Sequence, residues 1–183
     1  MQTLRLSHEQ MQSIVNHARN EQPYEACGII AGSVGVASRI IPIKNAAINA
    51  EYHYQMDAQE LLQALKDMDS AAEEMLGVYH SHPKNEPIPS PEDVREAQLN
   101  TPNIVHIIIS LKYGKARLQA WHIQDGQAHK VELLVGNQIS VSLPAMTQAQ
   151  IIAVILAAIL AMLFLLIISF SLLPPAPPIP TAQ

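Results

Sequence analysis

The order of apolar and polar residues predicts helices and strands along the first 135 residues. From Ser7 to Arg19, apolar residues recur at three- and four-residue spacing. This predicts an amphipathic helix that Ser7 caps and that follows a short strand near Leu4. The same spacing predicts a second helix over residues 57–69. Its expected buried stripe consists of Leu61, Leu62, Leu65 and Met68.

Strand-like patterns fill most of the remaining sequence before residue 136. A turn containing Gly32 and Gly35 is expected to join the first two strands, and Asp125-Gly126 is a hairpin signal between the last two. A short helix is expected to begin near Ser90. The result is a mixed α/β domain, residues 1–135, large enough to bury its own core. Its predicted strands cover residues 26–35, 37–43, 75–82, 104–111, 115–123 and 128–135.

The chain changes character after its last charged residue, Glu132. Residues 151–173 are apolar apart from two serines. At about 1.5 Å per residue they would extend roughly 34 Å, enough to cross a hydrocarbon core of about 30 Å. This predicts one C-terminal transmembrane helix, since the alternative, a buried core helix, is usually shorter and has a polar side. Residues 136–150 are then a linker, and the proline-rich residues 174–183 are an extended tail.

The N-terminal sequence bears on localisation. Residues 1–22 contain no apolar h-region, and polar or charged residues occur early in them, at Arg5, His8 and Glu9. No secretory signal peptide is therefore expected. A domain followed by one span is the arrangement of a tail-anchored protein. We therefore expect a single-pass membrane protein whose N-terminal domain lies in the cytoplasm.

Net charge and cysteine content exclude nucleic-acid binding and structural roles that need several cysteines. The formal net charge of −5 at pH 7 lacks the basic footprint that nucleic-acid binding requires. Cys27 is the only cysteine, so neither an intrachain disulfide nor a cysteine-rich structural zinc site can form.

Candidate chemistry is concentrated in residues 80–93. His80 and His82 lie two residues apart on a predicted strand, so both imidazoles point to the same side and can reach one metal ion. Asp93, returned by the following loop, would be a third ligand. Two imidazoles and a carboxylate suit zinc and leave a fourth position open for water, as catalytic sites do. The alternative is that Ser90 and Asp93 only cap a helix, because Ser-Pro-Glu-Asp is also a helix start.

The spacing His80-x-His82-Pro83, six residues, Ser90, two residues, Asp93 resembles the JAMM signature of the MPN-domain zinc metallopeptidases. In that family a glutamate lies far upstream, and Glu25 fits its position. The resemblance covers the chain from about Leu4 to Val135. It implies the MPN fold, a cytidine-deaminase-like mixed β-sheet flanked by helices.

The resemblance also implies the role of each residue. His80, His82 and Asp93 would hold Zn²⁺. Glu25 would accept a proton from the attacking water and deliver it to the departing amine, and Ser90 would donate a hydrogen bond to the oxyanion. Without the downstream motif, Glu25 reads as an ordinary acid at the start of a strand.

The family cleaves peptide or isopeptide bonds after the C-terminal Gly-Gly of ubiquitin-like proteins. The sequences around His17, Glu25 and Tyr79 are similar to the small bacterial members that release cysteine from a sulfur-carrier protein. Three hypotheses remain open. They are a processing peptidase for a sulfur carrier, a general deconjugating isopeptidase for ubiquitin-like modifiers, and a membrane-anchored scaffold without catalysis.

Other reactive or aromatic residues are interpreted as structural. Cys27 lies in an apolar strand pattern, where a small buried residue is more common than a nucleophile. The residues expected to pack or to support the fold, rather than to bind substrate or metal, are Tyr79, Trp121, His53, His106 and His122.

Overall fold

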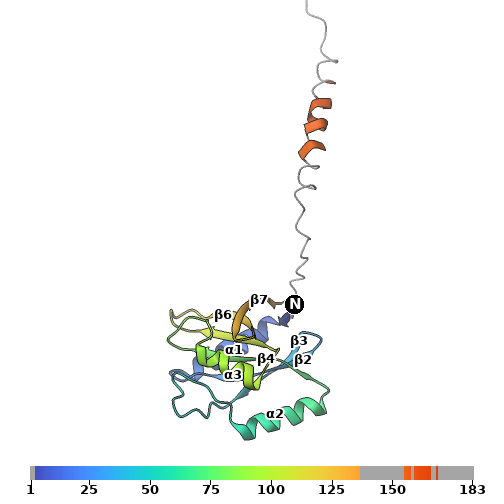
Figure 1. The fold of residues 1–183 in the computed structure, drawn as a ribbon. Coiled ribbons are helices and arrows are strands. Elements are labelled where there is room, and N and C mark those ends of the chain that lie inside the picture. Colours follow the sequence, from blue (N-terminus) through green and yellow to red (C-terminus); the bar gives the residue numbers. More distant parts are fainter. Residues whose placement is uncertain (1–2, 137–154, 158, 166–167, 169–183) are drawn as a thin grey trace, which may run out of the picture. The chain divides into compact units, whose positions relative to one another are not determined.

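A computed structural model describes residues 3–136, 155–157, 159–165 and 168. The chain divides into two compact units, Met1–Ile139 and Ser140–Gln183. In the first unit, the described residues form three helices and eight strands (Figure 1). The helices are α1 (His8–Asn20), α2 (Ala58–Ser70) and α3 (Pro91–Asn100). The strands are β1 (Leu4–Leu6), β2 (Cys27–Ser33), β3 (Val36–Ile43), β4 (Glu74–His82), β5 (Val105–Ser110), β6 (Arg117–Gln124), β7 (Gln127–Val131) and β8 (Leu133–Val135).

All eight strands of residues 3–136 belong to one mixed sheet, in the order β7-β6-β5-β4-β2-β3-β1-β8. The pairs β4–β5, β1–β3 and β1–β8 are parallel, and the other pairs are antiparallel. The predicted α/β fold, a mixed sheet flanked by helices, is confirmed.

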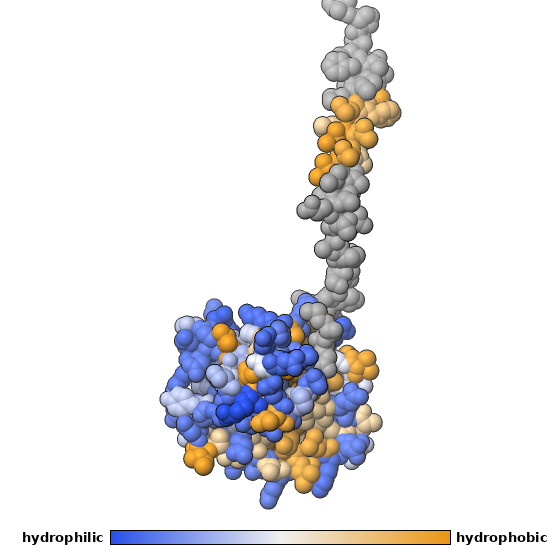
Figure 2. All heavy atoms as spheres, viewed as in Figure 1, coloured by the Kyte–Doolittle hydropathy of each residue, from blue (hydrophilic) through white to orange (hydrophobic). Residues whose placement is uncertain are grey.

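The sheet carries helices on both faces. Successive strand residues point to opposite sides, and apolar residues on each side pack against a helix. Ile30 and Tyr79 pack against α1 in one apolar cluster. Ile29 and Ala31 pack against α2 in the other. The space-filling view shows a mainly hydrophilic surface with apolar groups between the polar ones (Figure 2). Each face of the sheet therefore has its own core, and β2 and β4 lie at the centre of both.

The helix starts follow the predicted caps. Ser7 accepts a hydrogen bond from the Gln10 N–H at 3.0 Å, and the Gln10 side chain accepts one from the Ser7 N–H at 2.8 Å, so α1 begins with a capping box. Asp57 caps α2 through the N–H groups of the next turn.

The predicted stripe of α2 is partly wrong. Leu62 and Leu65 are 54% and 40% exposed. The helix instead buries Ala64 and Met68 and packs Leu61 partly against the sheet. These three positions lie on one side of the helix, and an alanine allows α2 to approach closely, which turns the two leucines outward.

The predicted turn between the first two strands is partly wrong. Gly32 lies inside β2 rather than in a turn, and the turn is Val34-Gly35, with φ of 50° and 74°. A Cβ on Gly32 would lie 2.1 Å from the Val36 carbonyl oxygen, so the close approach of β3 requires glycine here.

The predicted strand 128–135 is two strands. β7 ends at Val131 on one edge of the sheet, and β8 begins at Leu133 beside β1 on the other. Two Cα–Cα steps span less than about 8 Å. The sheet therefore curls until its two edges approach each other.

Among the described residues, no helix has both the length and the apolar character needed to cross a membrane. The predicted span, residues 151–173, lies for the most part outside the described residues, as do most of the predicted linker and all of the predicted tail.

Candidate metal centre

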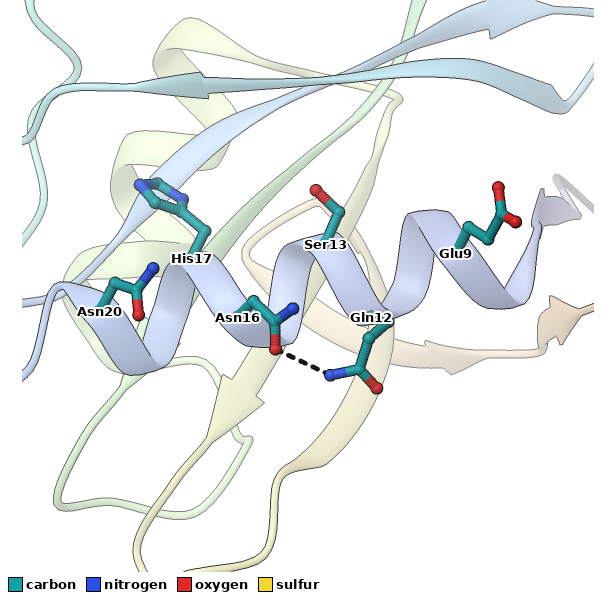
Figure 3. Close-up of a pocket in the computed structure, with 6 residues that line it drawn as sticks. All are labelled: Glu9, Gln12, Ser13, Asn16, His17 and Asn20. Atoms are coloured by element: carbon teal, nitrogen blue, oxygen red, sulfur yellow. Dashed lines mark hydrogen bonds between the residues drawn. The ribbon is translucent and has the colours of Figure 1, made fainter.

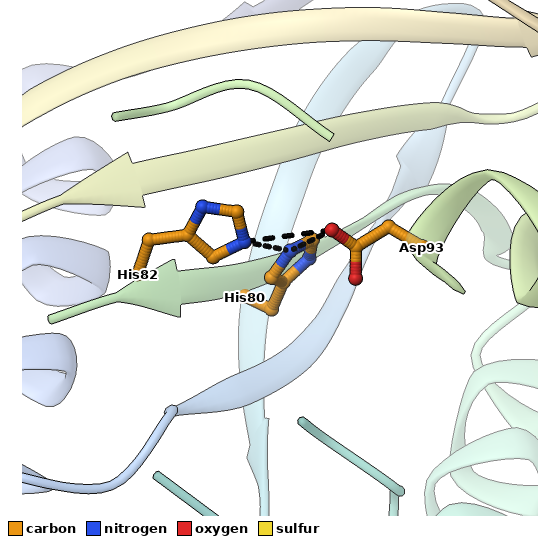
Figure 4. Close-up of side chains that lie close together, drawn as sticks. All are labelled: His80, His82 and Asp93. Carbon is orange, nitrogen blue, oxygen red and sulfur yellow. Dashed lines mark hydrogen bonds and ion pairs between the residues drawn. The ribbon is translucent and has the colours of Figure 1, made fainter. Parts of the chain in front are cut away.

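His80 and His82 lie at the C-terminal end of β4. This central strand pairs with β2 on one side and with β5 on the other. Both side chains point to one face of the sheet, while Ser81 between them points to the other and accepts a hydrogen bond from the Ala26 N–H at 2.9 Å. Asp93 comes from the first turn of α3. Figure 4 shows the three side chains directed at one another.

The three side chains fit a zinc ion. His80 Nε2 and His82 Nε2 lie 3.1 Å apart, and Asp93 Oδ2 lies 3.6 Å from the first and 3.5 Å from the second. Tetrahedral zinc with ligands at about 2.0–2.1 Å places neighbouring ligand atoms roughly 3.3 Å apart. The three observed separations lie on either side of that value, so one ion can reach all three atoms.

The ionised state of Asp93 also favours a cation at this site. Burial alone would raise the pKa of Asp93, but hydrogen bonds with His80 and His82 outweigh it and hold the pKa well below its usual range. Burial lowers the pKa of His80. For His82, burial acts in the same direction, but the hydrogen bonds with Asp93 and Glu86 prevail and raise its pKa. An ionised carboxylate beside imidazole nitrogens is the form that binds a metal.

Asp93 has both of the roles that the sequence left open. Its Oδ2 accepts a hydrogen bond from the Ser90 N–H at 2.7 Å, and Ser90 Oγ accepts one from the Asp93 N–H at 3.1 Å, which completes the capping box of α3. The same Oδ2 faces the two imidazoles. The helix cap therefore fixes the ligand.

Glu25, two residues before β2, lies beside the metal-binding residues. It is 3% exposed, and its Oε1 is 4.0 Å from His82 Nε2. Burial raises its pKa to about 8, an effect that nearby His82 reduces. The main chain holds this residue through two contacts, since its N–H donates to Ala50 O at 2.7 Å and its carbonyl accepts from Asn45 Nδ2 at 2.9 Å.

The Ser90 hydroxyl can still donate a hydrogen bond. Its oxygen accepts the Asp93 N–H, and a hydroxyl has one proton to donate besides its two lone pairs. Ser90 is the N-cap of α3, three residues before the metal-binding Asp93.

The sequence did not indicate Tyr54 or Asn45. The Tyr54 ring stacks on His80 with 4.5 Å between ring centroids and 19° between ring planes. Asn45 hydrogen-bonds to the main chain of Glu25 and to the residues that flank Tyr54. Neither residue belongs to a spaced motif, so only the folded chain shows their place.

Of the residues interpreted as structural, Cys27, Tyr79, Trp121 and His106 are buried, whereas His53 is exposed. Cys27 is fully buried, its Sγ contacts the Ile43 carbonyl, and burial raises its pKa to about 12, which makes it a poor nucleophile. Tyr79 is buried and hydrogen-bonds to His17, and Trp121 donates to the Pro87 carbonyl. The metal cluster found within the described residues includes none of His53, His106 and His122.

Two hollows lie outside the metal-binding cluster. The larger one, about 550 Å³, is a polar depression along one face of α1 (Figure 3). The smaller one, about 210 Å³, is lined by Glu25 together with His17, Glu21, Lys44 and Glu60. Glu25 thus lines the second hollow and is not among the residues that line the first.

A curled mixed sheet with two histidines from a central strand, an aspartate from a helix start and a buried glutamate defines a metallopeptidase of the JAMM type. The family model for prokaryotic homologues of the JAB domain matches residues 7–124. The chain belongs to this family, and His80, His82 and Asp93 form its zinc site.

Individual relatives agree with this assignment. The chain is 33% identical over 113 residues to a desampylase of Haloferax volcanii, covering 58% of this chain and 80% of the relative. It is 34% identical over 117 residues to a CysO-cysteine peptidase of Mycobacterium tuberculosis, covering 62% and 78%. A protein of Desulfitobacterium hafniense solved in solution has 32% identity and a TM-score of 0.66, over 75% of this chain and 95% of that one.

Proposed function

We propose that this zinc peptidase hydrolyses the peptide or isopeptide bond that follows the C-terminal Gly-Gly of a ubiquitin-like or sulfur-carrier protein. The observation that carries the chemistry is the buried Glu25 carboxyl, 4.0 Å from a zinc-binding imidazole. The substrate class is supported by the names of the two relatives, a desampylase and a CysO-cysteine peptidase. A Gly-Gly tail is thin enough to enter a narrow groove and to pair as an added strand.

Each residue has one task in this proposal. Bound zinc supplies a Lewis acid that polarises the scissile carbonyl and acidifies water. Glu25 takes a proton from the attacking water and returns it to the departing amine, a task for which its buried carboxyl beside the zinc-binding His82 is placed. The Ser90 hydroxyl donates a hydrogen bond to the oxyanion.

The leaving group separates two enzyme hypotheses. A sulfur-carrier peptidase releases cysteine from the Gly-Gly end, whereas a deconjugating isopeptidase releases a lysine side chain of a target protein. The third hypothesis, a scaffold without catalysis, has the intact set of metal ligands against it.

The deciding experiment gives the full-length chain two substrates that share one carrier protein. One carrier ends in Gly-Gly-Cys, and the other is joined through Gly-Gly to a lysine. Cleavage of either that stops with a chelator and returns with zinc supports the proposal, and the preferred substrate identifies the leaving group. A zinc-loaded protein that cleaves neither overturns the substrate class.

We further propose that residues 151–173 hold the enzyme in a membrane as a single span, with the catalytic domain in the cytoplasm. The support is the length and apolar character of this segment in the sequence. Extraction of membranes with alkaline carbonate tests the span, and protease digestion of sealed cells and of lysates tests the orientation. Release of the protein by carbonate would contradict the proposal.

A further inference from the structure

The two zinc-binding histidines are held in different ways. A metal-binding imidazole usually donates its second ring N–H to a carbonyl or carboxylate, which fixes the ring. His82 follows this rule, since its Nδ1 lies 2.8 Å from the Glu86 carbonyl oxygen. His80 does not. Its Nδ1 is buried and, among the described residues, has no hydrogen-bond partner.

An aromatic ring takes the place of the missing hydrogen bond. Tyr54 lies nearly parallel to the His80 imidazole, with centroids 4.5 Å apart and planes inclined by 19°. His80 is 1% exposed, and its Nε2 points at His82 Nε2 and Asp93 Oδ2. A stacked neighbour restricts rotation of the imidazole out of its plane.

Tyr54 is itself held by Asn45. Asn45 Nδ2 donates to the carbonyls of Glu25 and His53, and its Oδ1 accepts from the N–H groups of Ala47 and Gln55, all at 2.9–3.0 Å. The whole hydrogen-bonding capacity of this amide is therefore used. Two of its four contacts go to the residues immediately before and after Tyr54.

The rest of the loop between β3 and α2 is anchored as well. Ala46 N–H donates to the Gln55 carbonyl at 2.7 Å, and Asp57 N–H donates to the Lys44 carbonyl at 2.9 Å. The segment on both sides of Tyr54 is thus fixed before any metal or substrate arrives, and the Tyr54 ring is placed by the main chain.

We propose that Tyr54 is a positioning residue of the zinc site, whose ring holds the His80 imidazole at the angle that points Nε2 at the metal. The inference rests on the zinc site of the proposed function. It assigns the ring, rather than the hydroxyl, as the part of Tyr54 that matters, because the stack uses the ring face.

The test compares Tyr54→Phe, which keeps the ring, with Tyr54→Leu, which removes it, in the full-length chain. The matched control is Tyr52→Leu, in the same loop, where the tyrosine is 53% exposed and contacts Lys84. Zinc affinity is measured by competition with a chromophoric chelator. The visible spectrum of the cobalt(II)-substituted protein reports the ligand geometry without reference to activity.

Loss of the ring should weaken zinc binding about 10- to 100-fold, the range found when a group that orients a metal-binding histidine is removed. Tyr54→Phe and Tyr52→Leu should stay within about threefold of wild type on this scale, and only Tyr54→Leu should change the cobalt spectrum. A folded Tyr54→Leu protein with wild-type zinc affinity and cobalt spectrum overturns the inference.

If Tyr54→Leu does not fold, Asn45→Ala takes its place, since it releases the two residues that flank Tyr54 without changing the ring. Weaker zinc binding with a changed cobalt spectrum is the expected result, and wild-type behaviour overturns the inference. Failure of the wild-type chain to bind zinc at all would instead overturn the zinc site on which the proposed function depends.

Discussion

Asp93 accepts a hydrogen bond from the Ser90 N–H through the same oxygen, Oδ2, that faces the two imidazoles. The distance to the Ser90 nitrogen is 2.7 Å, and those to His80 and His82 are 3.6 and 3.5 Å. Because α3 begins at this residue pair, the start of the helix sets the position of the third ligand. Folding of α3 and assembly of the metal site are therefore coupled through one atom.

The coupling predicts a double effect of Asp93→Ala. The metal-free protein should lose about 1 kcal/mol of stability, because a capping contact is removed, and zinc binding should be abolished, because only two ligands remain. Asp57→Ala is the matched control, since Asp57 caps α2 and has no part in the metal cluster. Chemical unfolding with chelator present and zinc titration separate the two effects. Zinc bound normally by Asp93→Ala would show that the carboxylate is only a cap.

Glu25→Gln should retain zinc and lose turnover. The amide keeps the size of the side chain but cannot accept a proton, so the rate should fall by about 10²- to 10⁴-fold. Glu21→Gln is the control, because Glu21 is a nearby acid whose side chain is 49% exposed. The measurements are zinc content and the rate on the preferred carrier substrate. Near-normal turnover in a zinc-loaded Glu25→Gln protein would remove Glu25 from the mechanism.

Ser90 is the N-cap of α3 and the proposed hydrogen-bond donor to the oxyanion, and Ser90→Gly separates these two roles. Glycine is tolerated at a helix N-cap with a loss of only a few tenths of a kcal/mol, so stability should be nearly unchanged. Loss of an oxyanion donor should lower kcat by about 10²- to 10³-fold. Ser7→Gly, at the equivalent cap of α1, should leave kcat unchanged. If the two variants have the same kcat, Ser90 acts only through the helix.

The sequence predicted the parts of the fold and site that depend on local spacing. The i, i+2 histidines on a strand and the Ser90–Asp93 helix start are short-range patterns, and the structure brings His80, His82 and Asp93 together. The exposure of Leu62 and Leu65 was not predicted, because three- and four-residue spacing allows several adjacent stripes and only the partner surface selects one.

The contacts that support the site depend on long-range structure. Tyr54 reaches His80 across 26 positions of the sequence, and Asn45 reaches Glu25 across 20. The pairing of β8 with β1 joins opposite ends of the domain. None of these contacts has a periodic or spaced signal, so the curl of the sheet and the orientation of His80 appear only in the folded chain.

Buried His106 predicts a loss of stability in mild acid. The residue is 2% exposed, and burial, with a smaller contribution from His80, lowers its pKa from 6.5 to about 4. Between these values the unfolded chain binds a proton that the folded chain does not. The free energy of unfolding is therefore not reduced by His106 above pH 6.5. It decreases as the pH falls toward 4, by on the order of 3 kcal/mol in total.

The variant His106→Gln isolates this effect from the other titrating groups. Its unfolding free energy, measured with chelator present at several pH values from 7.5 to 4, should fall less steeply than that of wild type, by up to about 1.4 kcal/mol per pH unit. His129→Gln is the control, because it makes the same substitution at an exposed position on β7. Parallel curves for wild type and His106→Gln would mean that His106 binds a proton equally in the folded and unfolded chains, and would overturn this prediction.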